Sequence, residues 1–153
     1  FSAAWSFSPL AYLWHGCKQT DTFQNIKTMS LDVYLFRKKW VSFDEGATHT
    51  EEIEEVYSAN ITHNLNKMAI EAGIYECLWR PDESFVSEDG NVYARDLIEQ
   101  MGKGLNLMKA NPAIFKAFNS PNGWGLYEHF VPWIERYLAA CIANPDSIVT
   151  VSR

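Results

Sequence analysis

The chain has 153 residues, of which 47% are hydrophobic and 21% are charged. This length and composition are typical of one globular domain with an ordinary hydrophobic core. The formal net charge is −6, and the only basic run is Arg37-Lys38-Lys39. Because a nucleic-acid surface needs clustered basic residues, we expect no nucleic-acid partner.

Three widely spaced cysteines, Cys17, Cys77 and Cys141, bear on metal binding and on cellular compartment. No C-x-x-C pair is present, so the sequence predicts no structural zinc site, and no motif indicates another metal or a cofactor. Scattered cysteines in odd number are typical of reduced, buried thiols, which favours a cytoplasmic location. The apolar run near the N-terminus is interrupted at Ser8-Pro9 and is too short to span a bilayer, so we expect no membrane partner.

The first 28 residues differ in character from the rest of the chain. They are apolar and aromatic, and they lack both the charged start and the small-residue cleavage site of a signal peptide. Met29, followed by Ser-Leu-Asp-Val-Tyr-Leu, is a more natural beginning. We therefore interpret residues 1–28 as an upstream extension that is non-native or poorly packed, and residues 29–153 as a single globular domain.

The first elements after Met29 follow from the spacing of apolar residues. Apolar and polar residues alternate over residues 31–36, which predicts a strand. Residues 37–55 are polar and end in an acidic run, which predicts a solvated loop. A helix is then predicted from Asn60, which suits an N-cap, to Gly73, which suits the left-handed residue past a helix end.

The second half of the chain is predicted to be mainly helical. Apolar residues at helical spacing predict helices over residues 93–109, 112–118 and 126–143, and Pro132 is expected to kink or restart the last of these. Residues 148–152 predict a terminal strand, whose simplest partner is the strand at 31–36. The expected fold class is thus α+β and mainly helical, with three to five helices packed on a small two-stranded sheet.

Two dense polar and aromatic blocks stand out on this frame. In the first, the helical projection places Asn60, Asn64, Lys67 and Glu71 on one stripe, with His63 at its border. The second is a glycine-rich turn, Asn122-Gly-Trp-Gly125, which delivers Trp124 and Glu128 to the start of the last helix. A simple core does not need such residues close together, and we expect the two blocks to meet in space.

Several of these segments resemble motifs of a family of short phage and bacterial proteins. The resemblance is carried by Ala59-Asn-Ile-Thr-His-Asn-Leu65, Glu71-Ala-Gly-Ile-Tyr75, Leu78-Trp-Arg-Pro81 and Asn122-Gly-Trp-Gly-Leu-Tyr-Glu128. It covers residues 29–36 and most of 56–153. It implies a phage, prophage or host-defence setting, and it implies no catalytic residues because no activity is attached to the family.

One hypothesis for the chemistry is acid–base catalysis. His63 changes charge near neutral pH and could act as a general base together with Glu71 or Glu128. The structural alternative is a histidine hydrogen-bonded at a helix start, with both carboxylates solvated or paired with Arg80 or Lys67.

A second hypothesis concerns the aromatic residues. Trp79 and Trp124 could stack on a planar ligand while Arg80 binds its phosphate or carboxylate. The structural alternative is an aromatic core together with an arginine–glutamate ion pair.

Three functions remain compatible with the sequence. The leading interpretation is a non-enzymatic binding protein for a small polar ligand or a host protein, and no sequence feature indicates its oligomeric state. The second is a small hydrolase-like enzyme that uses His63 with Glu71 or Glu128. The third is an assembly protein whose polar blocks are purely structural. The ligand-binding residues predicted for the leading interpretation are Asn60, His63, Asn64, Trp79, Arg80, Trp124 and Glu128.

Overall fold

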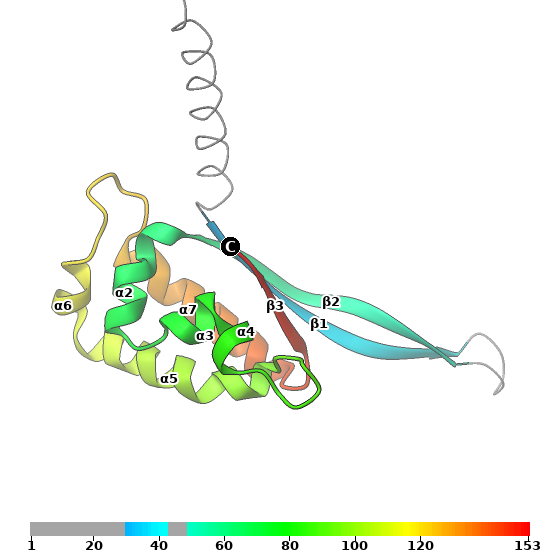
Figure 1. Cartoon of the computed structure of the whole chain (residues 1–153). Helices are drawn as coiled ribbons and strands as arrows, with labels where there is room; N and C mark the ends of the chain where they lie inside the picture. The colour runs from blue at the N-terminus through cyan, green and yellow to red at the C-terminus, as the bar shows by residue number, and fades with distance from the viewer. Residues whose placement is uncertain (1–29, 43–48) are drawn as a thin grey trace, which may run out of the picture.

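The computed structural model describes residues 30–42 and 49–153. Three strands and six α-helices follow one another in this part of the chain, together with a 3-10 turn (Figure 1). The interpretation of residues 1–28 as an extension therefore falls outside the described residues. The elements are β1 (Ser30–Ser42), β2 (His49–Thr62), η1 (His63–Leu65), α2 (Asn66–Glu71), α3 (Tyr75–Trp79), α4 (Pro81–Ser84), α5 (Ala94–Ala110), α6 (Pro112–Lys116), α7 (Tyr127–Ala143) and β3 (Ile148–Ser152).

The sheet is antiparallel and has three strands in the order β2-β1-β3. The strands predicted at 31–36 and 148–152 do pair, with Asp32 opposite Ser152 and Phe36 opposite Ile148. The two-stranded sheet was nevertheless wrong, because β2 occupies the other edge of β1. The number of helices was also underestimated, since α2, α3 and α4 are three short helices in a region where the sequence predicted one.

β2 replaces both a predicted loop and the predicted start of a helix. The acidic run from Glu51 to Glu55 is strand, paired with the basic residues of β1. Asn60 lies in the same strand and donates from its side-chain amide to Asp32 Oδ1 at 2.5 Å, so it does not cap a helix. The prediction of one polar stripe along a helix from Asn60 to Glu71 is therefore wrong, because α2 begins only at Asn66.

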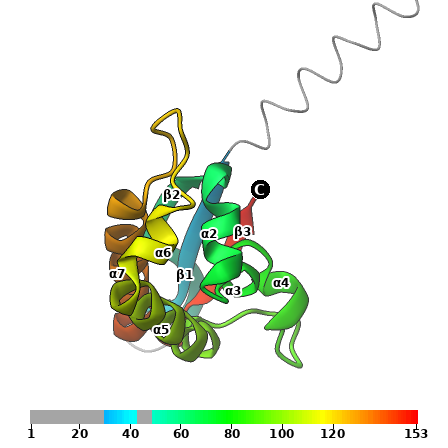
Figure 2. The same cartoon turned by 90° about the vertical axis from the view of Figure 1, so that its left-hand side faces the viewer.

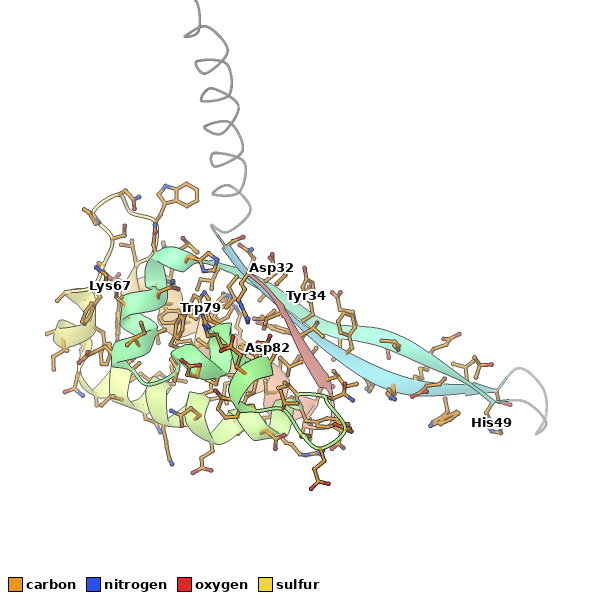
Figure 3. The ribbon with its side chains drawn as sticks, viewed as in Figure 1. Asp32, Tyr34, His49, Lys67, Trp79 and Asp82 are labelled. Carbon is orange, nitrogen blue, oxygen red and sulfur yellow. The ribbon has the colours of Figure 1, made fainter. Side chains whose placement is uncertain are left out.

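β1 and β2 form a hairpin that extends well beyond the helices (Figure 1). In its first half Leu31, Val33 and Leu35 are fully buried on the face that the helices cover. The register shifts between Leu35 and Phe36, and beyond this bulge most side chains are exposed. Figure 3 shows Tyr34 beside the helical body and His49 far from it, near the other end of the hairpin.

The long helices α5 and α7 pack against each other at the lower left of the body in Figure 2. Their predicted positions were correct, and α7 continues through Pro132 without a break. None of the helices in the described part of the chain combines the length and apolar character needed to cross a membrane. The core formed around them includes Met68, Ile74, Leu78, Trp79, Leu97, Met101, Met108, Phe115, Phe130, Ile134, Tyr137 and Cys141.

Candidate functional site

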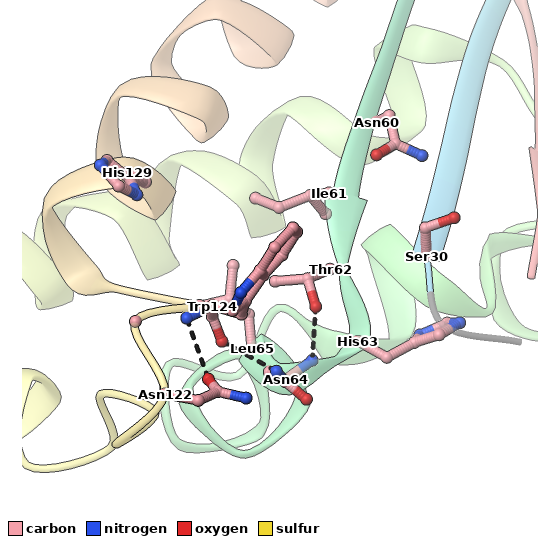
Figure 4. A pocket seen from close by; sticks show the side chains of 12 residues that line it. Ser30, Asn60, Ile61, Thr62, His63, Asn64, Leu65, Asn122, Trp124 and His129 are labelled. Carbon is pink, nitrogen blue, oxygen red and sulfur yellow. Dashed lines mark hydrogen bonds between the residues drawn. The ribbon is translucent and has the colours of Figure 1, made fainter. Parts of the chain in front are cut away.

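A cavity of about 950 Å³ opens where β2 ends and the chain turns into the helical body (Figure 4). Its walls come from the start of β1, the end of β2, the η1 turn, the loop before α7 and the first turn of α7. The lining residues are Ser30, Asn60, Ile61, Thr62, His63, Asn64, Leu65, Asn122, Gly123, Trp124, Gly125 and His129.

The loop before α7 is held in shape by its own side chains. Asn122 Oδ1 accepts hydrogen bonds from the backbone amide of Trp124 at 3.0 Å and from Ser120 Oγ at 2.6 Å. Asn119 Oδ1 accepts from the backbone amide of Tyr127 at 2.7 Å, which satisfies one free amide at the start of α7. The loop is thus a hydrogen-bonded platform on one side of the cavity.

This loop lies directly against the η1 turn. The side-chain Nδ2 of Asn64 donates to the carbonyl oxygen of Trp124 at 2.9 Å, and the backbone amide of Asn64 donates to Thr62 Oγ1 at 3.3 Å (Figure 4). A Cβ at Gly125 would lie 2.9 Å from Asn64 Cβ, and the φ of +104° at this position also favours glycine. The prediction that the two polar blocks meet is confirmed by these contacts.

Trp124 is the most exposed aromatic residue at this site. Its side chain is 70% accessible, although its backbone is held by Asn64 and Asn122. A large apolar ring on a rigid backbone offers a flat face at low entropic cost. Trp124 is therefore the residue of the cavity best suited to stacking on a ligand.

His63 is tied to the core on one side. Trp79 Nε1 donates to His63 Nδ1 at 2.7 Å, so this ring nitrogen is unprotonated and any proton sits on Nε2. Partial burial lowers the pKa of His63 below its ordinary value of 6.5, while the Asn66 side chain acts in the opposite direction. The imidazole that lines the cavity is therefore held in its neutral form.

The cavity wall carries no aspartate, glutamate, lysine or arginine among the described residues. The carboxylate of Glu128 lies instead 3.7 Å from Lys116 Nζ, outside the cavity. Glu71 is exposed at the end of α2. Neither carboxylate forms a hydrogen bond with His63 in the described part of the chain, so the two proposed acid–base pairs are not brought together.

Two other predicted ligand-binding residues also lie away from the cavity. Trp79 is only 1% exposed and stacks on Tyr75 with 5.6 Å between ring centroids, which leaves its faces no room for a ligand. Arg80 is exposed and pairs with Glu83 at 3.1 Å. Of the seven predicted residues, the structure thus brings together four around one cavity: Asn60, His63, Asn64 and Trp124.

Four further polar residues of the cavity wall were not among the predicted ligand-binding residues, namely Ser30, Thr62, Asn122 and His129. Asn122 and His129 lie beside the predicted residues Trp124 and Glu128, but neither was itself predicted to bind a ligand. Ser30 and Thr62 become neighbours only through the pairing of β1 with β2, which was not predicted. The register of the β1–β2 pair, which sets Ser30 opposite Thr62, is the information that was missing for these two residues.

Residues 30–42 and 49–153 contain no group of three histidine, cysteine, aspartate or glutamate side chains placed to hold a metal ion. The chain matches no protein-family model, and no curated protein or solved structure is significantly similar to it. The chemistry of the cavity therefore has to be inferred from its own residues.

Proposed function

We propose that the chain is a non-enzymatic binding protein that takes a small, uncharged ligand with a flat ring face in the cavity beside Trp124. The observation that carries the proposal is the composition of the wall, which combines an exposed tryptophan with amide, hydroxyl and imidazole groups and, among the described residues, has no aspartate, glutamate, lysine or arginine. Apolar pockets with a few convergent polar groups are typical ligand sites.

The neutral wall favours one class of polar ligand over another. A phosphate or carboxylate entering the cavity would lose water without gaining a lysine or arginine partner from the described residues, which is costly. A neutral ring can stack on Trp124 while Asn60, Asn122 and His129 offer hydrogen-bonding groups around the same cavity. Nucleosides and pyranosides are two chemical classes that combine such a face with several hydroxyl or amide groups.

The hydrolase alternative has less support. Nδ1 of His63 is already engaged by Trp79, and His63 forms no hydrogen bond with Glu71 or Glu128 in the described chain. Because Nδ1 accepts from Trp79, Nε2 carries the proton of the neutral ring, and neither nitrogen has a free lone pair with which to act as a general base. We therefore favour a binding protein without catalytic turnover over the hydrolase.

The setting that we propose is phage or bacterial, on the strength of the motif resemblance, and cytoplasmic. The two described cysteines, Cys77 and Cys141, are free and buried, which suits a reducing compartment. A nucleic-acid partner is disfavoured because Arg37 and Lys38 are paired with Glu54 and Glu51 at 2.7 and 2.9 Å.

The proposal is tested by calorimetric titration of the full chain with nucleosides, the matching 5′-monophosphates and methyl pyranosides. Either the nucleosides or the methyl pyranosides should bind. If nucleosides bind, their 5′-monophosphates should bind more weakly. Trp124→Ala should lower the affinity by about tenfold or more, since stacking of a base on an aromatic side chain contributes roughly 1–3 kcal/mol.

Trp40→Ala is the matched control, because Trp40 is 67% exposed but lies on the distal part of the hairpin. It should leave the affinity unchanged. Equal losses in the two variants, or binding of the phosphates alone, would contradict the proposed site. Conversion of a bound ligand to product that is lost in His63→Ala would favour the hydrolase instead.

A further inference from the structure

The distal half of the hairpin, residues 36–42 and 49–55, has two faces of different character. Residues directly opposite each other in an antiparallel pair share a face. The register places Phe36 with Glu55, Lys38 with Ile53 and Trp40 with Glu51 on one face, which we term the outer face. The other face carries two charged pairs, Arg37 with Glu54 and Lys39 with Glu52, followed by Val41 with Thr50.

The large apolar side chains of this segment gather on the outer face. Trp40 is 67% exposed and Ile53 is 70% exposed. The same face continues across β3, where Ile148 is opposite Phe36 and Thr150 is opposite Tyr34. A second cavity, of about 280 Å³, lies there and is lined by Phe36, Lys38, Ile53, Ile148 and Thr150.

Such a surface is unfavourable on an isolated protein. A two-stranded ribbon without a packed face is marginally stable in water, and an apolar stripe with a charged border is typical of an interaction surface. In the described chain, the core helices pack on the opposite side, against Leu31, Val33 and Leu35. The outer face therefore lacks an apolar partner among the described residues.

The charges of the two strands argue against joining two copies edge to edge. A two-fold pairing through β2 would set its four glutamates, Glu51, Glu52, Glu54 and Glu55, against the same residues of the other copy. A two-fold pairing through the edge of β1 that β3 does not cover would do the same with Arg37, Lys38 and Lys39. Like charges on neighbouring edges oppose strand addition, so these edges are protected.

Packing of outer face on outer face has the opposite electrostatic result. A two-fold axis parallel to the strands sets β1 of one copy over β2 of the other, so that the hairpins point the same way. Lys38 then faces the part of β2 that carries Glu51 and Glu55 on this surface. The same contact would remove Trp40 and Ile53 from water in both copies.

We propose that the outer face of the hairpin is a dimer interface, and that its occupant is the outer face of a second copy of this chain. The proposal is independent of the ligand cavity, which lies at the other end of β2. It rests on the segregation of apolar residues to one face together with the self-complementary charges of the two strands.

Sedimentation of the full chain from micromolar to millimolar concentration tests the proposal. The expected result is a monomer–dimer equilibrium, and Trp40→Lys and Ile53→Lys should each raise the dissociation constant by at least about tenfold. Ile142→Lys is the matched control, because Ile142 is a 58% exposed isoleucine on α7, and it should leave the constant unchanged.

A mixing experiment tests the charge arrangement. Lys38→Glu and Glu51→Lys each set like charges across the two-fold axis and should weaken self-association. An equimolar mixture of the two variants restores opposite charges at both contacts and should form a heterodimer more tightly than either variant forms a homodimer.

The proposal is overturned by a chain that stays monomeric up to millimolar concentration, which would assign the outer face to another partner or to residues 1–29. It is also overturned by a dimer that Trp40→Lys and Ile53→Lys do not weaken, or by a mixture that associates no better than its components.

Discussion

The pair formed by His63 and Trp79 joins the cavity to the core through one hydrogen bond. Trp79 is buried between Tyr75 and Phe130, with ring centroids 5.6 and 6.4 Å away, and the only polar atom of its side chain donates to His63 Nδ1. A buried indole N–H without an acceptor would be costly. The neutral ring of His63 is therefore a structural requirement of the core as well as part of the cavity wall.

This pair predicts a pH dependence of stability. Because the pKa of His63 is lowered in the folded protein, the unfolded chain takes up the proton first as the pH falls below 6.5. The free energy of unfolding should therefore decrease from about pH 7 towards the lower pKa of the folded state, and then level off with respect to this group. His63→Asn keeps an acceptor for Trp79 but cannot be protonated, and it should remove this part of the slope. Urea denaturation at a series of pH values measures the effect.

The control for this experiment is His49→Asn, which changes an exposed histidine at the start of β2, far from Trp79. In this variant the free energy of unfolding should still decrease between pH 7 and pH 5 by as much as in the unmodified protein. Carboxylates with lowered pKa, such as Asp82 beside Arg153, contribute only at lower pH, where their protonation costs stability. An unchanged slope in His63→Asn would show that protonation of His63 is not opposed by the fold.

Among the elements, the contact of α5 with the turn before α3 depends on a glycine. A Cβ at Gly104 would lie 2.0 Å from Cγ2 of Ile74 and 3.0 Å from the carbonyl oxygen of Ala72. Ile74 is fully buried and has little room to move. Gly104→Ala should therefore lower the free energy of unfolding by about 1–3 kcal/mol, although alanine favours a helix by roughly 1 kcal/mol.

Gly102 provides the matched control in the same helix. A Cβ at this position meets nothing within 4 Å, so Gly102→Ala should be neutral or should stabilise by up to about 1 kcal/mol. Thermal and urea unfolding of both variants measure the difference. If both substitutions changed the free energy of unfolding in the same direction, the close approach at Gly104 would not limit the packing of α5.

The elements also show which structural signals the sequence contains. α5 and α7 have buried apolar residues at helical spacing over about five turns, so their positions were predictable. β2 was not, because its distal part has no buried face and thus no apolar alternation. Its pairing with β1 through Arg37–Glu54 and Lys38–Glu51 depends on a partner strand that local pattern does not reveal.

The assignment of the end of β2 to a helix also explains which site residues were predicted. Ile61 and Leu65 are four residues apart and both are buried, which resembles one face of a helix, although Ile61 is buried from a strand. Asn60 and Asn64 line the same cavity because they are close in sequence, whereas Trp124 joins them through a tertiary contact, the hydrogen bond between Asn64 Nδ2 and its carbonyl oxygen. Trp79 and Arg80 lie on opposite sides of a boundary between core and solvent that only tertiary packing sets.

At the scale of the whole molecule, stability is distributed unevenly along the hairpin. Over Asp32–Phe36, β1 lies between β2 and β3 and its inward side chains are in the core. Over Arg37–Val41 it pairs with β2 but not with β3, and most side chains are exposed. Local opening of the distal half should therefore require much less free energy than opening of the proximal half.

Hydrogen exchange measures this difference directly. In the monomer, the distal amides, residues 37–42 and 49–55, should exchange about two orders of magnitude faster than the proximal amides at residues 31–35, after correction for intrinsic rates. Because dimerisation would cover the outer face, the distal rates should fall as the protein concentration rises, and they should stay high in Trp40→Lys. Equal protection of the two halves in dilute solution would mean that the ribbon is stable without a partner, and the physical reason for an occupant on its outer face would then be lost.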